Sequence, residues 1–130
     1  MRRAVANRAE GSCEYCGLSQ AGQEAAFHVD HIIPVASGGA TNLENLALAC
    51  VSCSLRKGAR EFITDPQTGE TCRVFNPRID VWREHFEWQE TILNGRTATG
   101  RATVEALKLN RPLVLVIREE EAHWGRHPPK

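Results

Sequence analysis

Two cysteine pairs frame one short apolar segment: CEYC at residues 13–16, HVDHIIP at residues 28–34 and CVSC at residues 50–53. A C-x-x-C turn aims two sulfur atoms at one point, and two such turns supply the four thiolates of a tetrahedral zinc site. We therefore expect Cys13, Cys16, Cys50 and Cys53 to bind a structural Zn²⁺ with no open coordination position. Cys72 has no such partner and is expected to be a free, half-buried thiol.

The composition fits a small protein that gains from a structural metal. The 130 residues correspond to one domain of ordinary size, and 42% of them are hydrophobic, which is enough for a modest core. The 16 basic and 16 acidic side chains cancel, so any contact with nucleic acid must come from a local patch. No apolar run approaches the length of a membrane span, and the first residues lack the apolar core of a signal peptide. We therefore expect no membrane association and a cytoplasmic location, where cysteines bind metal more often than they form disulfides.

Between the cysteine pairs, the residue pattern predicts a strand, a loop, a second strand and a helix. Residues 27–33 are rich in β-branched and apolar side chains and are followed by Pro34, which ends a strand. Residues 37–42 predict a loop, residues 43–49 a short second strand, and residues 54–60 a helix.

The second half of the chain predicts hairpins and helices. The pattern indicates, in order, a turn, a hairpin turn and two helices: residues 65–69, 94–95, 97–109 and 112–122. Trp82, Phe86 and Trp88 all have even numbers, as one face of a strand requires. We expect these three side chains to pack into the core of the second half.

Two adjacent polar residues, Asp30 and His31, interrupt the first predicted strand. Adjacent strand residues face opposite sides, so the carboxylate and the imidazole can serve different tasks. A hard divalent ion held by Asp30, Mg²⁺ or Mn²⁺, would neutralise a phosphate. A neutral His31 would take a proton from an attacking water, because the reference pKa of histidine, about 6.5, lies near working pH. A carbonyl from the loop around Asn45 is a candidate partner for the other ring nitrogen; an incidental polar pair is the alternative interpretation.

Basic side chains gather after the second cysteine pair. Arg56, Lys57 and Arg60 lie on the predicted helix, and Arg56 and Arg60 share a face because they are four residues apart. We expect these three residues to contact DNA phosphates. A solvated helix face is the alternative.

In these motifs the chain resembles the HNH endonuclease family. CEYC, HVDHIIP, the Gly38-Gly39 loop, NLENLALAC, and CVSC followed by SLRKG occur in the family's order over about residues 11–60. The resemblance implies a ββα-metal fold stapled by zinc and an endonuclease that hydrolyses DNA. It also implies that Asp30 is the metal-binding acid, that His31 is the general base, and that Asn45 positions this base.

One position departs from the family pattern. The family usually has His or Asn directly after the last cysteine, as a second metal ligand, whereas this chain has Ser54. The divalent ion would then bind through Asp30, through Ser54 or a bridging water, and through phosphate oxygens. His28 lies on the same strand face as Asp30 and is a possible substitute ligand. A zinc-stabilised DNA-binding module with weak or no catalysis is therefore an alternative, as is a zinc-stapled interaction protein.

We thus expect an α+β fold and a single HNH nuclease domain over residues 1–130. Its ββα-metal core would span about residues 11–60, followed by a C-terminal hairpin-plus-helix extension over about residues 61–124. The expected function is metal-dependent hydrolysis of DNA phosphodiester bonds. The sequence indicates neither an oligomeric state nor a preferred cutting site.

Overall fold

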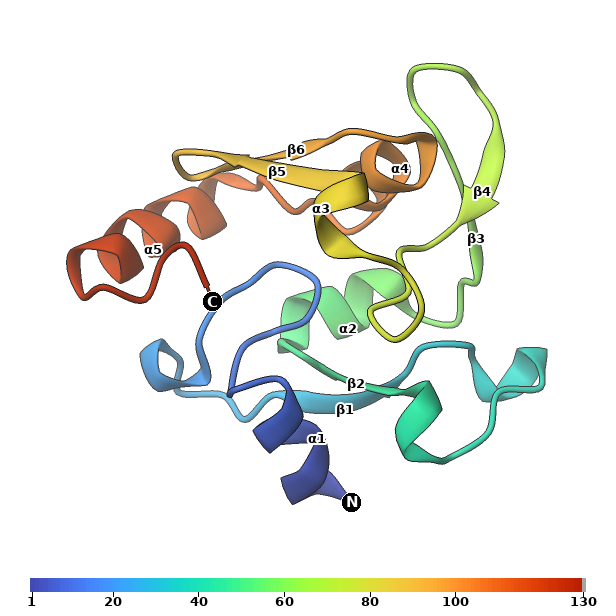
Figure 1. Ribbon diagram of the computed structural model, residues 1–130, viewed down its shortest axis with the longest axis horizontal. Helices are drawn as coiled ribbons and strands as arrows, with labels where there is room; N and C mark the ends of the chain where they lie inside the picture. Colours follow the sequence, from blue (N-terminus) through green and yellow to red (C-terminus); the bar gives the residue numbers. More distant parts are fainter. Residues whose placement is uncertain (130) are drawn as a thin grey trace.

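The computed structural model describes residues 1–129, in which short helices alternate with three two-stranded antiparallel sheets (Figure 1). The α-helices are α1 (Arg2–Arg8), α2 (Val51–Lys57), α3 (Trp82–His85), α4 (Ala98–Ala106) and α5 (Pro112–His123). The strands are β1 (His28–His31), β2 (Leu46–Ala49), β3 (Phe62–Thr64), β4 (Thr71–Arg73), β5 (Phe86–Gln89) and β6 (Ile92–Gly95). Three 3₁₀ turns complete the secondary structure: η1 (Gln20–Gly22), η2 (Val35–Ser37) and η3 (Leu43–Asn45).

The first half folds as a strand, a loop, a strand and a helix. β1 and β2 pair antiparallel, with His28 opposite Ala49 and His31 opposite Leu46. β2 is buried along its whole length and contacts both α1 and α2, which lie on opposite sides of the two strands (Figure 1). Cys50 is the N-cap of α2, and its sulfur accepts a hydrogen bond from the backbone N–H of Cys53. The second cysteine pair is therefore built into the start of the helix.

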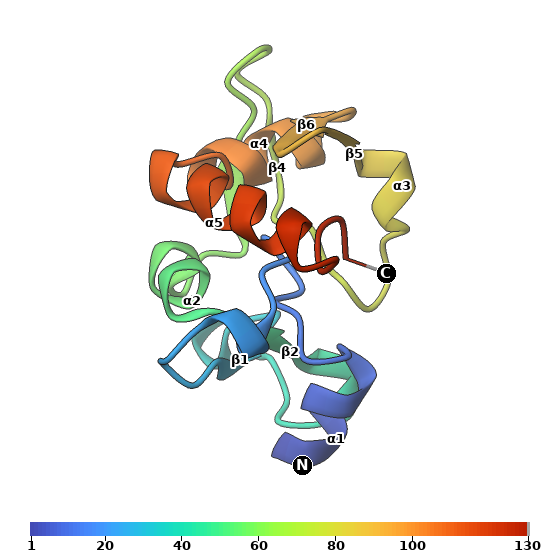
Figure 2. The same cartoon turned by 90° about the vertical axis from the view of Figure 1, so that its left-hand side faces the viewer.

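The second half forms a layer above this unit (Figure 2). α4 packs against both β6 and β3, and α5 returns to the loop that follows α1. One cluster of buried apolar side chains includes Leu46 from the first half and Phe86 and Leu107 from the second. Burial of each such side chain contributes about 1.5–3 kcal/mol, so both halves share the stabilising core.

The β5–β6 hairpin turns earlier than predicted. Gln89 pairs with Ile92, so the two-residue turn is at 90–91 rather than at Asn94-Gly95. Glu90 takes the positive φ of +56° that such a turn requires. Gly95 instead allows a close approach of α4, since a Cβ there would lie 2.4 Å from the backbone nitrogen of Arg101.

The aromatic residues pack as a group, but not from one strand face. Trp82 begins α3, whereas Phe86 and Trp88 lie on β5. The Trp82 ring centroid is nevertheless 5.7 Å from that of Phe86 and 5.8 Å from that of Trp88. Only Phe86 is fully buried, and both tryptophans are half-buried. The predicted packing is present, and the helical turn at Trp82 replaces the predicted strand alternation.

The α+β class is confirmed, with four cysteines gathered beside a ββα unit and a C-terminal extension of hairpins and helices. Among residues 1–129, no helix combines the length and apolar character needed to cross a membrane.

A buried ion pair joins the β3–β4 hairpin to α4. The fully buried carboxylate of Asp65 accepts hydrogen bonds from Arg101 Nε at 3.1 Å and Arg101 Nη2 at 2.8 Å. It also accepts from the Thr68 hydroxyl and the Gln67 N–H. The Arg101 guanidinium, aided by Thr68 and Gln67, holds the pKa of Asp65 well below its usual range despite burial.

Asp65→Asn is expected to lower the midpoint of thermal unfolding at pH 7. The pKa of Asp65 is lower in the folded state than in the unfolded state, where it is about 3.9. The ionised carboxylate therefore stabilises the fold fully above about pH 3.9, and this contribution is lost as the pH falls from there through the folded pKa. The difference in midpoint between wild type and variant should therefore shrink below about pH 4. Glu105→Gln, at the exposed Glu105–Lys108 pair, is the control and should have little effect. A pH-independent difference for Asp65→Asn would contradict the ionic interpretation.

Candidate metal centre and active site

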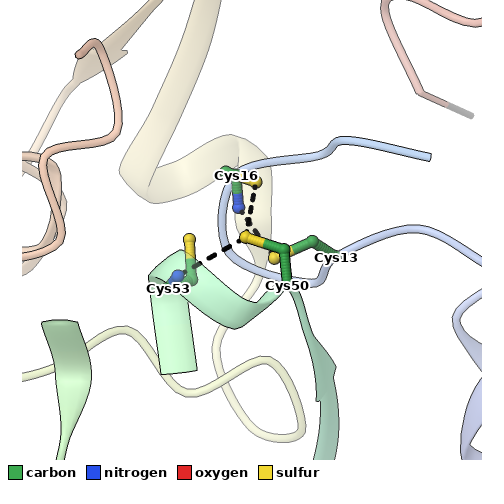
Figure 3. Close-up of side chains that lie close together, drawn as sticks. All are labelled: Cys13, Cys16, Cys50 and Cys53. Carbon is green, nitrogen blue, oxygen red and sulfur yellow. Dashed lines mark hydrogen bonds between the residues drawn. The ribbon is translucent and has the colours of Figure 1, made fainter. Parts of the chain in front are cut away.

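The four paired cysteines converge on one point. Their sulfur atoms all lie within 4.8 Å of one another, and the four residues are buried. Figure 3 shows the side chains of Cys13, Cys16, Cys50 and Cys53 gathered in one place. The Cys16 and Cys50 sulfurs are 3.7 Å apart. A tetrahedron with Zn–S bonds of about 2.3 Å has edges of about 3.8 Å. The donor set therefore has the size and chemistry of a closed metal site.

The electrostatics of the cluster also favour a cation. The Cys13 sulfur, with the Cys50 sulfur and burial, holds the pKa of both Cys16 and Cys53 well above the usual range. Four buried thiols cannot all ionise without a compensating positive charge, and a divalent ion supplies that charge. Backbone N–H groups of Cys16 and Cys53 already point at the sulfurs of Cys13 and Cys50, each at 3.4 Å. The four-cysteine cluster can thus hold a structural metal ion.

Cys72 lies outside this cluster. It is half-buried on β4, and burial raises the pKa of its thiol. Its place agrees with the prediction of a free thiol.

Asp30 and His31 lie next to each other on β1, the outer partner of the buried strand β2. The Asp30 side chain is 16% exposed, and its Oδ2 atom is buried without a hydrogen-bond partner. Burial raises the pKa of Asp30, and the nearby Lys57 ammonium opposes this shift. His31 is half-buried, and its Nε2 lies 2.8 Å from the Thr41 hydroxyl. Neither group is sealed in the core, as access to a substrate requires.

Lys57 is buried, whereas a contact with DNA phosphates would require it on the surface. Its side chain is only 1% exposed, and Nζ lies 3.2 Å from Asp30 Oδ2. Nζ also donates a hydrogen bond to the backbone carbonyl of His31 at 2.8 Å. The approach to Asp30 Oδ2 is ionic rather than a well-directed hydrogen bond, because that oxygen has no hydrogen-bond partner. One buried ammonium therefore touches both residues of the candidate site and is not available on the surface.

Asn45 acts on the loop that follows β1. It is buried, its Oδ1 accepts from the Ile33 N–H at 2.8 Å, and its Nδ2 donates to the carbonyls of Ile33 and Ala40. Gly39 allows the loop to pack this closely on Ile33, because a Cβ at residue 39 would lie 1.8 Å from the Ile33 carbonyl oxygen. Asn45 thus fixes the backbone two residues beyond His31. The side chain that contacts the imidazole is Thr41, a hydroxyl from the same loop, instead of the predicted carbonyl.

The remaining predicted residues lie on α2, just beyond it, and on β1. α2 begins at Val51 and ends at Lys57 instead of spanning residues 54–60, because Gly58 caps it, so Arg60 lies in the segment after the helix. Arg56 and Arg60 are exposed, and Arg60 also donates to the Ala106 carbonyl at 3.3 Å. Ser54 is half-buried one helical turn before Lys57, and His28 is exposed at the start of β1. Among residues 1–129, the four cysteines are the one group of three or more His, Cys, Asp or Glu side chains close enough to hold a metal. A divalent ion at Asp30 would therefore take most of its ligands from water and phosphate oxygens, as Mg²⁺ commonly does.

Sequence reasoning missed the place of Lys57, although the helical spacing contained a signal. Lys57 lies four residues after the buried Cys53, so both side chains share the inward face of α2. Arg56 is exposed on a different face of α2, and the exposed Arg60 lies beyond the C-cap residue Gly58. A comparable signal for Thr41 is missing, because it comes from an irregular loop.

Comparisons with known proteins agree with this geometry. The family model described as HNH endonuclease matches residues 13–60. The chain is 24% identical to the Septu protein PtuB of Bacillus thuringiensis over 113 residues, which are 85% of this chain and 41% of that relative. The chain thus spans less than half the length of this relative, and no solved structure matches it. The resemblance to the HNH endonuclease family is confirmed over residues 13–60, from the first cysteine pair to just beyond α2.

Proposed function

We propose that this chain is a metal-dependent HNH endonuclease that hydrolyses DNA phosphodiester bonds. The observation that carries the proposal is the arrangement of Asp30 and His31 on β1, with one buried lysine in contact with both. This arrangement belongs to the stretch that matches the HNH endonuclease family. The name of the Bacillus thuringiensis relative mentions no substrate. The proposal of DNA as the substrate therefore rests on the family resemblance and on the site chemistry.

His31 would act as the general base. Its imidazole takes a proton from water as the water oxygen forms a bond to phosphorus and the bond to the leaving oxygen breaks. The Thr41 hydroxyl orients the ring through Nε2, and Asn45 fixes the loop that carries Thr41. Asp30 would hold Mg²⁺ or Mn²⁺, which when bound neutralises phosphate charge. Ser54, which lies on α2, would supply its hydroxyl to this ion or to a bridging water.

The exposed guanidiniums of Arg56 and Arg60 would contact DNA phosphates. Arg56 lies on α2, whose inward face carries Lys57, and Arg60 lies three residues beyond the end of that helix, so both are near the candidate site without taking part in it. Such contacts set the register of the duplex and do not read its sequence. A DNA-binding module with weak or no catalysis is the second candidate, favoured by the presence of Ser54 where the family has a stronger ligand.

His31→Ala is expected to reduce plasmid cleavage by about 10²–10⁴-fold in Mg²⁺ or Mn²⁺, the contribution typical of a general base. His123→Ala is the matched control, because His123 is exposed at the end of α5, outside the stretch that carries the candidate site. DNA affinity at several salt concentrations should be similar for wild type and His31→Ala. DNA binding without metal-dependent cleavage by wild-type protein would favour the inactive module, and the absence of both would favour an interaction protein.

We further propose that the cysteine cluster binds one Zn²⁺ that stabilises the fold. Purified protein should contain about one zinc per chain by elemental analysis, the stoichiometry of a closed four-cysteine site. Cys50→Ser should lose the metal and lower the midpoint of thermal unfolding, because metal binding supplies folding free energy at such sites. Cys72→Ser should keep both the metal and the midpoint. An unchanged midpoint after complete zinc removal would contradict a structural role.

We also propose that Lys57 positions the active site. Lys57→Met should destabilise the fold by about 3–5 kcal/mol, because Asp30 is left without its buried counter-ion. The double variant Asp30→Asn/Lys57→Met removes both charges and should recover much of that loss, as chemical denaturation would measure. Equal, additive losses in the two single variants would contradict the coupling. Lys57→Arg should keep the charge but shift His31, so its kcat should fall more than its KM rises.

A further inference from the structure

Arg118 is a buried cation without an acidic partner among residues 1–129. It lies on α5 and is 1% exposed. Its guanidinium donates to the carbonyls of Thr91 at 2.9 Å and Cys16 at 3.1 Å and to the side-chain oxygen of Asn110 at 3.1 Å, and its Nε has no partner. All of these acceptors are neutral. The guanidinium also lies 4.9 Å from the ring centroid of Trp88, a contact that only partly replaces hydration.

A buried charge of this kind needs nearby negative charge. On α5, Glu119 and Glu120 are exposed, and Glu121, which shares a helix face with Arg118, already pairs with Arg126. The Cys16 carbonyl, in contrast, belongs to a cysteine of the sulfur cluster. Four thiolates carry −4 and a divalent ion carries +2, so a metal bound by the cluster would leave a net charge of −2.

A second arginine from the same helix reaches the cluster directly. Arg111 is the N-cap residue of α5, and its Nη2 lies 4.0 Å from the Cys50 sulfur. Its Nη1 donates to the carbonyls of Leu107 and Lys108, which hold the side chain in place. The first and second cysteine pairs are thus each approached by one guanidinium, and the two positive charges equal the net −2 of a metal-loaded cluster.

We propose that Arg111 and Arg118 form a cationic shell around the metal–thiolate centre, through which the C-terminal extension stabilises metal binding. The proposal rests on the structural metal but does not depend on nuclease activity. Both arginines lie outside residues 13–60, so the shell is supplied by a part of the chain that the family match does not cover. Their role is electrostatic and positional, since neither replaces a sulfur ligand.

Zinc transfer to a chromophoric chelator at neutral pH tests this proposal. Arg118→Met and Arg111→Met each remove the charge and keep much of the apolar volume. Each should weaken zinc affinity by about 10–100-fold, the effect usual for residues around a metal's ligands. Arg111→Lys should restore part of the affinity. Lys108→Met is the matched control, because it removes a half-exposed positive charge three residues before Arg111, and it should leave affinity unchanged.

A change in general stability is separated by measuring thermal unfolding with and without zinc. An electrostatic shell predicts that each substitution lowers the midpoint of the zinc-loaded protein more than that of the zinc-free protein. If Arg118→Met does not fold, the half-buried Arg111 decides the question. Zinc affinity of folded Arg111→Met within twofold of wild type would overturn the proposal, as would an equal loss in Lys108→Met. Wild-type protein that binds no zinc would instead overturn the structural metal itself, whatever the outcome of the cleavage assay.

Discussion

The convergence of four cysteine sulfurs within 4.8 Å is the constraint on which the rest of the molecule depends. The two cysteine pairs are separated by the whole β1–loop–β2 segment, and their sulfurs still meet at 3.7 Å. That meeting closes one end of the ββα unit and fixes where α2 begins. Because this helix starts at Cys50, the position of every later side chain on it follows from the cluster.

α2 converts that constraint into the geometry of the candidate site. Its inward face carries first Cys53, which contributes a sulfur, and one turn later Lys57, which contacts Asp30 and His31. The outward face carries Arg56, and the exposed Arg60 follows just after the helix ends. One short helix therefore connects the cysteine cluster, the strand that carries Asp30 and His31, and a basic surface. Displacing its first residue would disturb all three.

The predictable parts of the fold were those encoded by local spacing. The two C-x-x-C turns, the strand around Asp30 and the helix at the second cysteine pair each have a short-range signature, and all three occur in the structure, although α2 begins at Val51, three residues earlier than predicted. The turn at Glu90 was missed because Asn94-Gly95 carries the stronger local signal, while the packing of α4 against Gly95 decides the register. Lys57 was placed on the surface because a lysine is rarely buried, and its counter-ion comes from a distant strand. Arg118 offered no local signal, since its partner at Cys16 is 102 residues away.

That long separation has a consequence for the order in which the molecule is completed. A chain emerging from the ribosome presents both cysteine pairs when residue 53 is out, but Arg118 follows only after 65 further residues, the difference between 118 and 53. A metal bound by the cysteines at that stage would lie beside open solvent, where water screens its charge. When α5 docks, Arg118 makes its hydrogen bond to the Cys16 carbonyl, 102 residues away in the sequence. Because contacts of such large sequence separation are entropically costly to close, the docking of α5 belongs to the last steps in completing the fold.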